Sequence, residues 1–122
     1  MESILTSIKK LLGIEAEDTH FDPDIIMQIN MALMSLTQLG VGPSVGFVIT
    51  GKDEIWSDLL GDRKDIENAK SYVYLKVRLI FDPPSSSVLI EAIERQIREL
   101  EWRLNVQVDK PPVEVVPEEG RE

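Results

Sequence analysis

The segment DRKDIENAKSYVYLKVRLIFDPPSSSVLIEAIERQIRELEWRLN, residues 62–105, sets the architecture of the chain. It has two parts in which apolar side chains recur every three or four positions, a spacing typical of one face of an α-helix. Pro83 and Pro84 lie between the two parts and cannot continue a helix. We therefore predict a helical hairpin whose first helix ends near Phe81 or Asp82.

The apolar stripes of the two helices are expected to face each other. The first stripe consists of Ile66, Ala69, Val73, Val77 and Ile80, and the second of Ile90, Ile93, Ile97, Leu100 and Leu104. Asp62 is the predicted N-cap of the first helix. Ser85, Ser86 and Ser87 offer side-chain oxygens to the free amides at the start of the second.

Charged residues indicate which face of the second helix is solvated. An acid precedes a base by four residues three times, in Glu91 and Arg95, Glu94 and Arg98, and Glu99 and Arg103. Each exposed pair contributes only a few tenths of a kcal/mol, roughly, so the pattern indicates a helix surface rather than an active site. Residues 62–105 contain eight acids and eight bases, so the net charge of −9 arises elsewhere.

Composition narrows the possible functions. A chain of 122 residues fits one domain, and the absence of cysteine excludes thiol catalysis, cysteine-bound zinc and a disulfide framework and favours an intracellular origin. No cluster of Lys and Arg suits sequence-independent DNA binding. Neither a signal peptide nor an apolar run long enough to span a membrane is recognisable.

The first residues are predicted to add a short core helix and an acidic loop. Residues 2–12 have an amphipathic pattern that Gly13 stops, and core packing is favoured over a membrane-surface helix because the chain is acidic. Residues 15–24 contain five carboxylates and the sole histidine, His20. We interpret them as a loop that ends in Asp22 as N-cap and Pro23 as first helical residue, in preference to a metal site.

Residues 23–39 form a predicted helix with apolar residues on two opposite faces. One face carries Ile25, Ile29, Ala32, Leu36 and Leu39, and the other carries Met27, Met31 and Met34. The methionine face needs a partner, either another element of the same domain or a neighbouring subunit, for which flexible methionine is well suited. A haem or other cofactor site is disfavoured.

Residues 40–51 are rich in glycine and fit neither the P-loop nor the dinucleotide-binding pattern. We predict a loop or short β-ribbon at residues 41–51 that exposes Val45, Phe47 and Ile49 to a contact outside the domain. Residues 53–60 then read as one or two helical turns that place Trp56, Leu59 and Leu60 on the core and end at Gly61.

The helix signal ends after Asn105. Residues 106–122 contain three prolines and an acidic excess, so we predict a helical domain over residues 1–105 and an extended tail over 106–122. Val113, Glu114, Val115 and Val116 could add a strand to the edge of a partner's sheet. A frayed tail without a role is the alternative.

The segments DIIMQINMALMSLTQLGVGPSVGF, WSDLL and YVYLKVRLIFDPPSSSVLIEAIERQIRELEWRLN resemble the head-tail connector proteins, also called adaptor or head-completion proteins, of long-tailed bacteriophages and prophages. The likeness covers roughly residues 1–105 and is strongest in LTQLGVGP, FDPP and ELEWRLN. It involves no catalytic motif.

The resemblance implies a mainly α, antiparallel bundle of four to five helices without enzymatic activity or cofactor. It further implies a virion protein of the neck, made in the bacterial cytoplasm and assembled as a ring of about twelve copies between the portal and a stopper or tail-side protein. DNA would pass through the ring without specific binding. Val113 to Val116 would then contact the portal, and residues 40–51 a subunit or the tail side.

A different class of protein would show the same pattern. A cytoplasmic helical regulator or adaptor that homodimerises through the Met27, Met31 and Met34 face is the alternative that the residues leave open. An enzyme is disfavoured because the chain offers neither a nucleophile-base pair nor a recognisable set of metal ligands.

Overall fold

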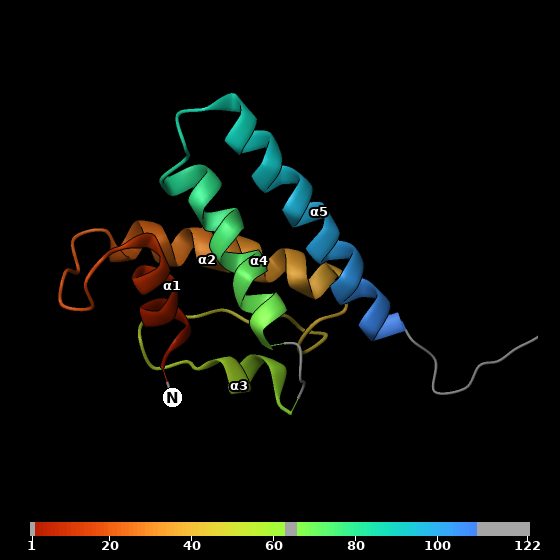
Figure 1. Cartoon of the computed structure of the whole chain (residues 1–122). Helices are drawn as coiled ribbons and strands as arrows, with labels where there is room; N and C mark the ends of the chain where they lie inside the picture. Colours follow the sequence, from red (N-terminus) through yellow and green to blue (C-terminus); the bar gives the residue numbers. More distant parts are fainter. Residues whose placement is uncertain (1, 63–65, 110–122) are drawn as a thin grey trace, which may run out of the picture.

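The predicted mainly α fold is confirmed by the computed structural model, which describes residues 2–62 and 66–109 (Figure 1). The described helices are α1 (Ile4–Leu12), α2 (Asp22–Gln38), α3 (Trp56–Leu60), α4 (Ile66–Phe81) and α5 (Ser87–Asp109). The one β-bridge in these residues is antiparallel and joins Ser3 to Ile55.

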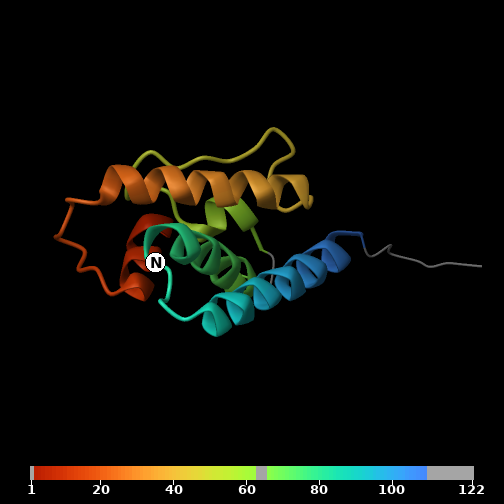
Figure 2. The ribbon, with the colours of Figure 1, turned by 90° about the horizontal axis from the view of Figure 1, so that it is seen from above.

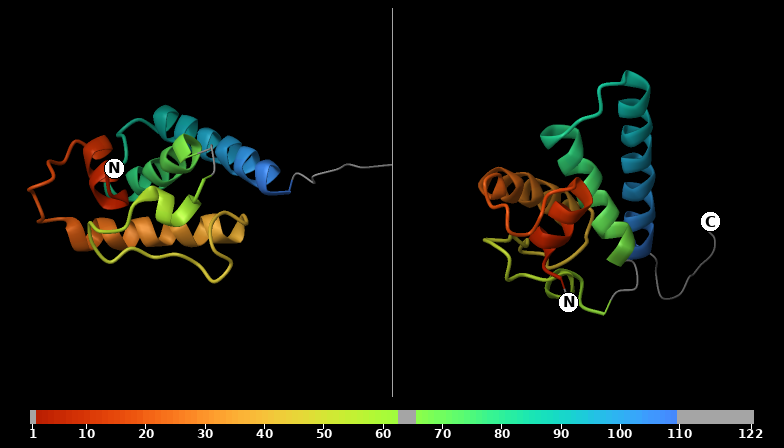
Figure 3. Two further views of the ribbon diagram at one scale, coloured as in Figure 1. Left: turned by 90° about the horizontal axis from the view of Figure 1, so that it is seen from below. Right: turned by 60° about the vertical axis from the view of Figure 1, so that its left-hand side comes forward.

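Helix α4 is the centre of the bundle. It packs against α2, α5 and α1. Four of its side chains are at most 1% exposed: Ala69, Tyr72, Val73 and Val77. Viewed from above, the chain forms layers in which the 41–55 segment lies outside α2, α2 lies on α4, and α5 covers the opposite side of α4 (Figure 2). The short α3 lies beside α1 below α2 (Figure 3).

The predicted stripe of α5 is confirmed except at Ile90, which is only partly buried, and that of α4 is wrong at its end. Ile93, Ile97, Leu100 and Leu104 are buried, whereas Ile80 is 61% exposed. Ile80 lies in the last turn of α4 and lines an open notch between α2 and α4, whereas its neighbours Leu79 and Phe81 pack against the core.

Because α4 packs on two sides, it buries a broader arc than one stripe. Tyr72 and Leu75 are part of that arc, and the Tyr72 hydroxyl donates a hydrogen bond of 2.9 Å to Oε2 of Glu101 on α5. Burial and this acidic acceptor raise the pKa of Tyr72.

Several predicted helix ends are observed. Gly13 ends α1 at φ 84°, Gly61 ends α3, and the Ser86 hydroxyl accepts a hydrogen bond from the Leu89 amide at the start of α5. Of the predicted pairs on α5, Glu99 and Arg103 approach to 2.7 Å. The start of α4 adjoins residues 63–65, outside the described residues, so Asp62 stays a prediction.

Two predicted boundaries are wrong. Helix α2 begins at Asp22 with Phe21 as its cap, because the Asp22 carboxylate is engaged elsewhere. Helix α5 continues past Asn105 to Asp109. The first proline after Asn105 is Pro111, and a proline disfavours the helical conformation at the residue before it, here Lys110.

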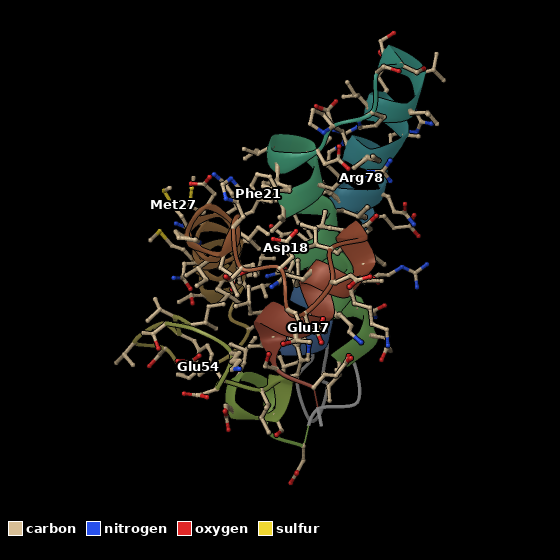
Figure 4. All side chains as sticks on the ribbon, turned by 90° about the vertical axis from the view of Figure 1, so that its left-hand side faces the viewer. Glu17, Asp18, Phe21, Met27, Glu54 and Arg78 are labelled. Carbon is tan, nitrogen blue, oxygen red and sulfur yellow. The ribbon has the colours of Figure 1, made fainter. Side chains whose placement is uncertain are left out.

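The Asp22 carboxylate binds a buried lysine. Lys9 of α1 is 2% exposed, and its Nζ lies 2.8 Å from Asp22 Oδ1. The same Nζ donates to the carbonyls of Ala16 at 3.1 Å and Asp18 at 2.7 Å. The acidic segment therefore wraps around the end of Lys9, which explains its path from α1 to α2 (Figure 4, near Asp18).

The turn before α3 is fastened to the N-terminus. The Ile4 amide donates to the Glu54 carbonyl at 2.9 Å, and Trp56 Nε1 donates to the Ser7 hydroxyl at 2.9 Å inside the core. Trp56, Leu59 and Leu60 are buried, as predicted. Within the described ranges, no helix is both long and apolar enough to cross a membrane.

We expect Lys9→Met to lower the free energy of unfolding by about 3 kcal/mol, because it leaves the Asp22 carboxylate and two carbonyls without their partner. Urea unfolding followed by circular dichroism measures the change. Lys10→Met is the matched control, since the Lys10 side chain is 75% exposed. Equal midpoints for the two variants would contradict a structural role for Lys9.

Candidate interaction groove

Helix α2 has the two predicted apolar faces, and of the two partners left open for the methionine face, the described part of the domain is not one. Ile25, Ile29, Ala32, Leu33 and Leu36 are at most 1% exposed. Met27, Met31 and Met34 are 53%, 54% and 63% exposed, so the described part of the domain does not cover them, and Met27 projects from the outer side of α2 (Figure 4). Leu39, predicted on the buried face, is partly buried.

The segment after α2 turns back along the methionine face. A Schellman motif at the end of α2 starts this return. The Gly40 amide donates to the Thr37 carbonyl at 3.0 Å, and the Val41 amide donates to the Leu36 carbonyl at 2.9 Å. Gly40 has φ 87°, and Val41 is fully buried. The next residue that fixes the path is Gly42, at which a Cβ atom would meet Leu59 Cδ1 at 2.7 Å.

The far end of the segment is held by one side chain of α2. Asn30 Oδ1 accepts from the Ile49 amide at 2.8 Å, and Asn30 Nδ2 donates to the Ile49 carbonyl at 3.0 Å. The amide group thus pairs with the backbone as a neighbouring strand would. Residues 41–51 form a loop and not the alternative β-ribbon.

Ile49 corrects one predicted exposure. The sequence predicted Val45, Phe47 and Ile49 all facing outward, but Ile49 is 2% exposed and belongs to the core. Val45 is 94% exposed and Phe47 is partly buried against the core. The strict alternation assumed for these residues fails because the Asn30 contact turns Ile49 inward.

Hydrogen bonds to Glu54 hold the same end of the loop at Thr50. Glu54 Oε2 accepts from the Thr50 amide at 3.1 Å and from its hydroxyl at 3.0 Å. Desolvation opposes ionisation, but hydrogen bonds from the backbone of Glu54 and from Thr50 prevail and lower the pKa of Glu54. The loop is therefore fixed at both ends, and Val45 is presented between them.

Helix α2 and the loop enclose an open groove of about 730 Å³. It is lined by Pro23, Ile26, Met27, Asn30, Met31, Met34, Thr37, Val45, Gly46, Phe47 and Val48. Two sets of residues that the sequence analysis treated separately, the methionines and the loop, thus line one site. We call it the α2-loop groove.

The chemistry of the α2-loop groove is that of a binding surface. None of its lining residues is titratable, and Asn30 already uses its amide group on Ile49. Flexible thioethers along a concave apolar surface suit a protein partner. In the described parts of the chain, no three His, Asp or Glu side chains lie close enough to share a metal ion.

Sequence reasoning missed Asn30, which positions the loop. A signal was present: asparagine is a poor former of helix interiors, and Asn30 lies between Met27 and Met31 in the middle of the helix. It also missed Val48, which is 62% exposed in the groove wall. The predicted tail contacts Val113, Glu114, Val115 and Val116 lie outside the described residues.

Asn30→Ala should leave the amide and carbonyl of Ile49 unpaired and lower the free energy of unfolding by about 1–3 kcal/mol. Hydrogen exchange at the Ile49 amide should accelerate in parallel. Gln38→Ala, at an exposed position of the same helix, is the control. Unchanged exchange at Ile49 would contradict the anchoring role.

Comparisons with known proteins place the chain in a protein family. The model of a family described as phage connector protein matches residues 4–111 and so spans all five described helices. The searches of curated proteins and of solved structures gave no significant match. The family match covers nearly the whole chain, and the protein therefore belongs to the phage connector family.

Proposed function

We propose that the protein is a structural component of the phage neck that assembles as a ring, of about twelve copies, between the portal and the stopper or tail-side protein. The family match over residues 4–111 carries this proposal. The ring continues the DNA channel, has no catalytic role and is part of the virion.

The α2-loop groove supports a subunit contact. Monomeric proteins rarely expose contiguous apolar surface without using it, and Met27, Met31, Met34 and Val45 are all more than half exposed around one concavity. Methionine face and loop therefore act together as one interface, rather than as separate subunit and tail-side contacts.

The charge of the protein suits a channel wall. The net charge is −9, and residues 1–61 contain nine acids and three bases, one of which, Lys9, is buried. A surface of this sign repels DNA phosphates and lets the duplex move without being held.

The proposed portal contact is the segment that follows α5. Helix α5 ends at Asp109, so we place the start of the portal-binding tail there and not at residue 106. Val113, Glu114, Val115 and Val116 supply a short apolar and acidic strand that pairs with the edge of a portal sheet.

Electron microscopy of the protein mixed with its portal tests the proposed function. The expected result is a closed ring coaxial with the portal. A complex in which single copies or dimers bind the portal away from its axis would overturn the proposal.

Met31→Asp should weaken self-association at least about tenfold while leaving the helix content and melting temperature nearly unchanged, because a charge in a desolvated contact opposes association more than folding. Sedimentation velocity and circular dichroism measure the two effects. Leu11→Asp, at an exposed apolar position of α1, is the control. Loss of helix content in Met31→Asp would show that the methionine supports the fold.

Deletion of residues 110–122 should shift the melting temperature by less than about 2 °C and abolish capture of the protein by its portal. Pull-down on immobilised portal measures capture. Retention of portal binding by the truncated chain would remove the tail from the proposed mechanism and leave the ring interface unaffected.

A further inference from the structure

The outer face of α5 carries exposed apolar and charged side chains that the described part of the chain does not cover. Its inner side is the buried row described above, and the residues diametrically opposite follow the same three- and four-residue spacing. They are Val88, Glu91, Arg95, Arg98, Trp102 and Val106. Trp102 is 67% exposed and Val106 41% exposed, on adjacent turns. We call Arg95, Arg98, Trp102 and Val106 the α5 ridge.

The α5 ridge and the α2-loop groove lie on opposite sides of the molecule. Figure 2 shows the loop beyond α2 on one side and α5 on the other, with α4 between them. Since the buried row of α5 faces α4, the ridge faces away from α4 and from the groove.

We propose that the α5 ridge of one copy occupies the α2-loop groove of the next. This inference rests on the proposed ring and identifies its contact. Head-to-tail assembly requires two different, complementary patches on each subunit, whereas a twofold dimer requires one patch that complements itself. A convex ridge and a concave groove on opposite faces meet the first requirement.

The shapes and chemistry of the two surfaces match. The groove is mainly apolar, and its lining includes three flexible methionines, which adapt to an indole ring and make favourable contacts with aromatic rings through sulfur. Tryptophan and arginine are the side chains most often found to dominate protein interfaces. The ridge contains one tryptophan and two arginines.

The charges favour one orientation. Helix α2 contains Asp22 and Asp24 in its first turn and no basic residue, and on α5 the arginines precede Trp102. Seen from above, both helices run from left to right (Figure 2), but in Figure 1 α5 descends steeply across α2. Opposite charges come together when Arg95 and Arg98 of the ridge are placed toward the first turn of α2 while Trp102 enters the groove.

Cysteine cross-linking tests this pairing on an otherwise cysteine-free chain. Met31→Cys and Trp102→Cys are made in separate full-length chains, expressed together and oxidised after purification. We expect a disulfide-linked dimer that contains one chain of each kind, because such bonds form only when the Cα atoms are within about 7 Å. Leu11→Cys with Trp102→Cys is the control and should give no such product.

The remaining outcomes separate this inference from the proposed function. Met31→Cys chains linked to one another would indicate a twofold dimer. In a second experiment Val115→Cys replaces Trp102→Cys, and a link between Met31→Cys and Val115→Cys would indicate that the tail fills the groove. Either result, or absence of the mixed product in preparations that contain rings, overturns the pairing alone. Preparations that form no ring even on the portal contradict the proposed function as well.

Trp102→Ala provides the quantitative test. We expect it to weaken self-association by about 30-fold, the effect of a central interface tryptophan, without loss of helix content. Val88→Ala removes an apolar side chain that is 70% exposed at the other end of the same helix face, and it should change association less than about twofold. Equal effects of the two substitutions would overturn a specific role for Trp102.

Discussion

The burial of α4 between α2 and α5 is the constraint on which the rest of the molecule depends. A helix that is covered on both sides leaves each neighbour with a single inward face. Helix α2 accordingly buries its isoleucine and leucine row and leaves its methionines outside, and α5 buries one row and leaves Trp102 outside. The two exposed apolar surfaces therefore follow from the layer order.

Polar contacts then determine the paths of the connections. Lys9 draws the acidic segment around its amine and directs the chain into α2, and Asn30 draws the returning loop onto the outer side of that helix. Both side chains bind backbone atoms and so fix where the chain runs, and Lys9 in addition pairs with the Asp22 carboxylate. The groove exists because this second connection runs beside α2 and not away from it.

Local periodicity was enough to predict the helices, the hairpin, the separate methionine face of α2 and the placement of Trp56 on the core. It was not enough for residues whose environment depends on distant contacts. Nothing in the local sequence indicates that Lys9 is buried, because the acidic segment that covers it follows α1 in the chain, and Ile49 was predicted exposed because its pairing with Asn30 is 19 residues away. Ile80 follows the helical spacing correctly, but spacing does not reveal that this position lines an open notch beside α2.

The way in which the loop is held has a consequence for its evolution. Main-chain groups at Ile49 and Thr50 and the glycine at position 42 define its course, while the side chains of Val45 and Val48 are exposed. Substitutions at these two positions can alter the shape and preference of the binding surface with little penalty to folding. A lineage could thus exchange one assembly specificity for another while its scaffold persists.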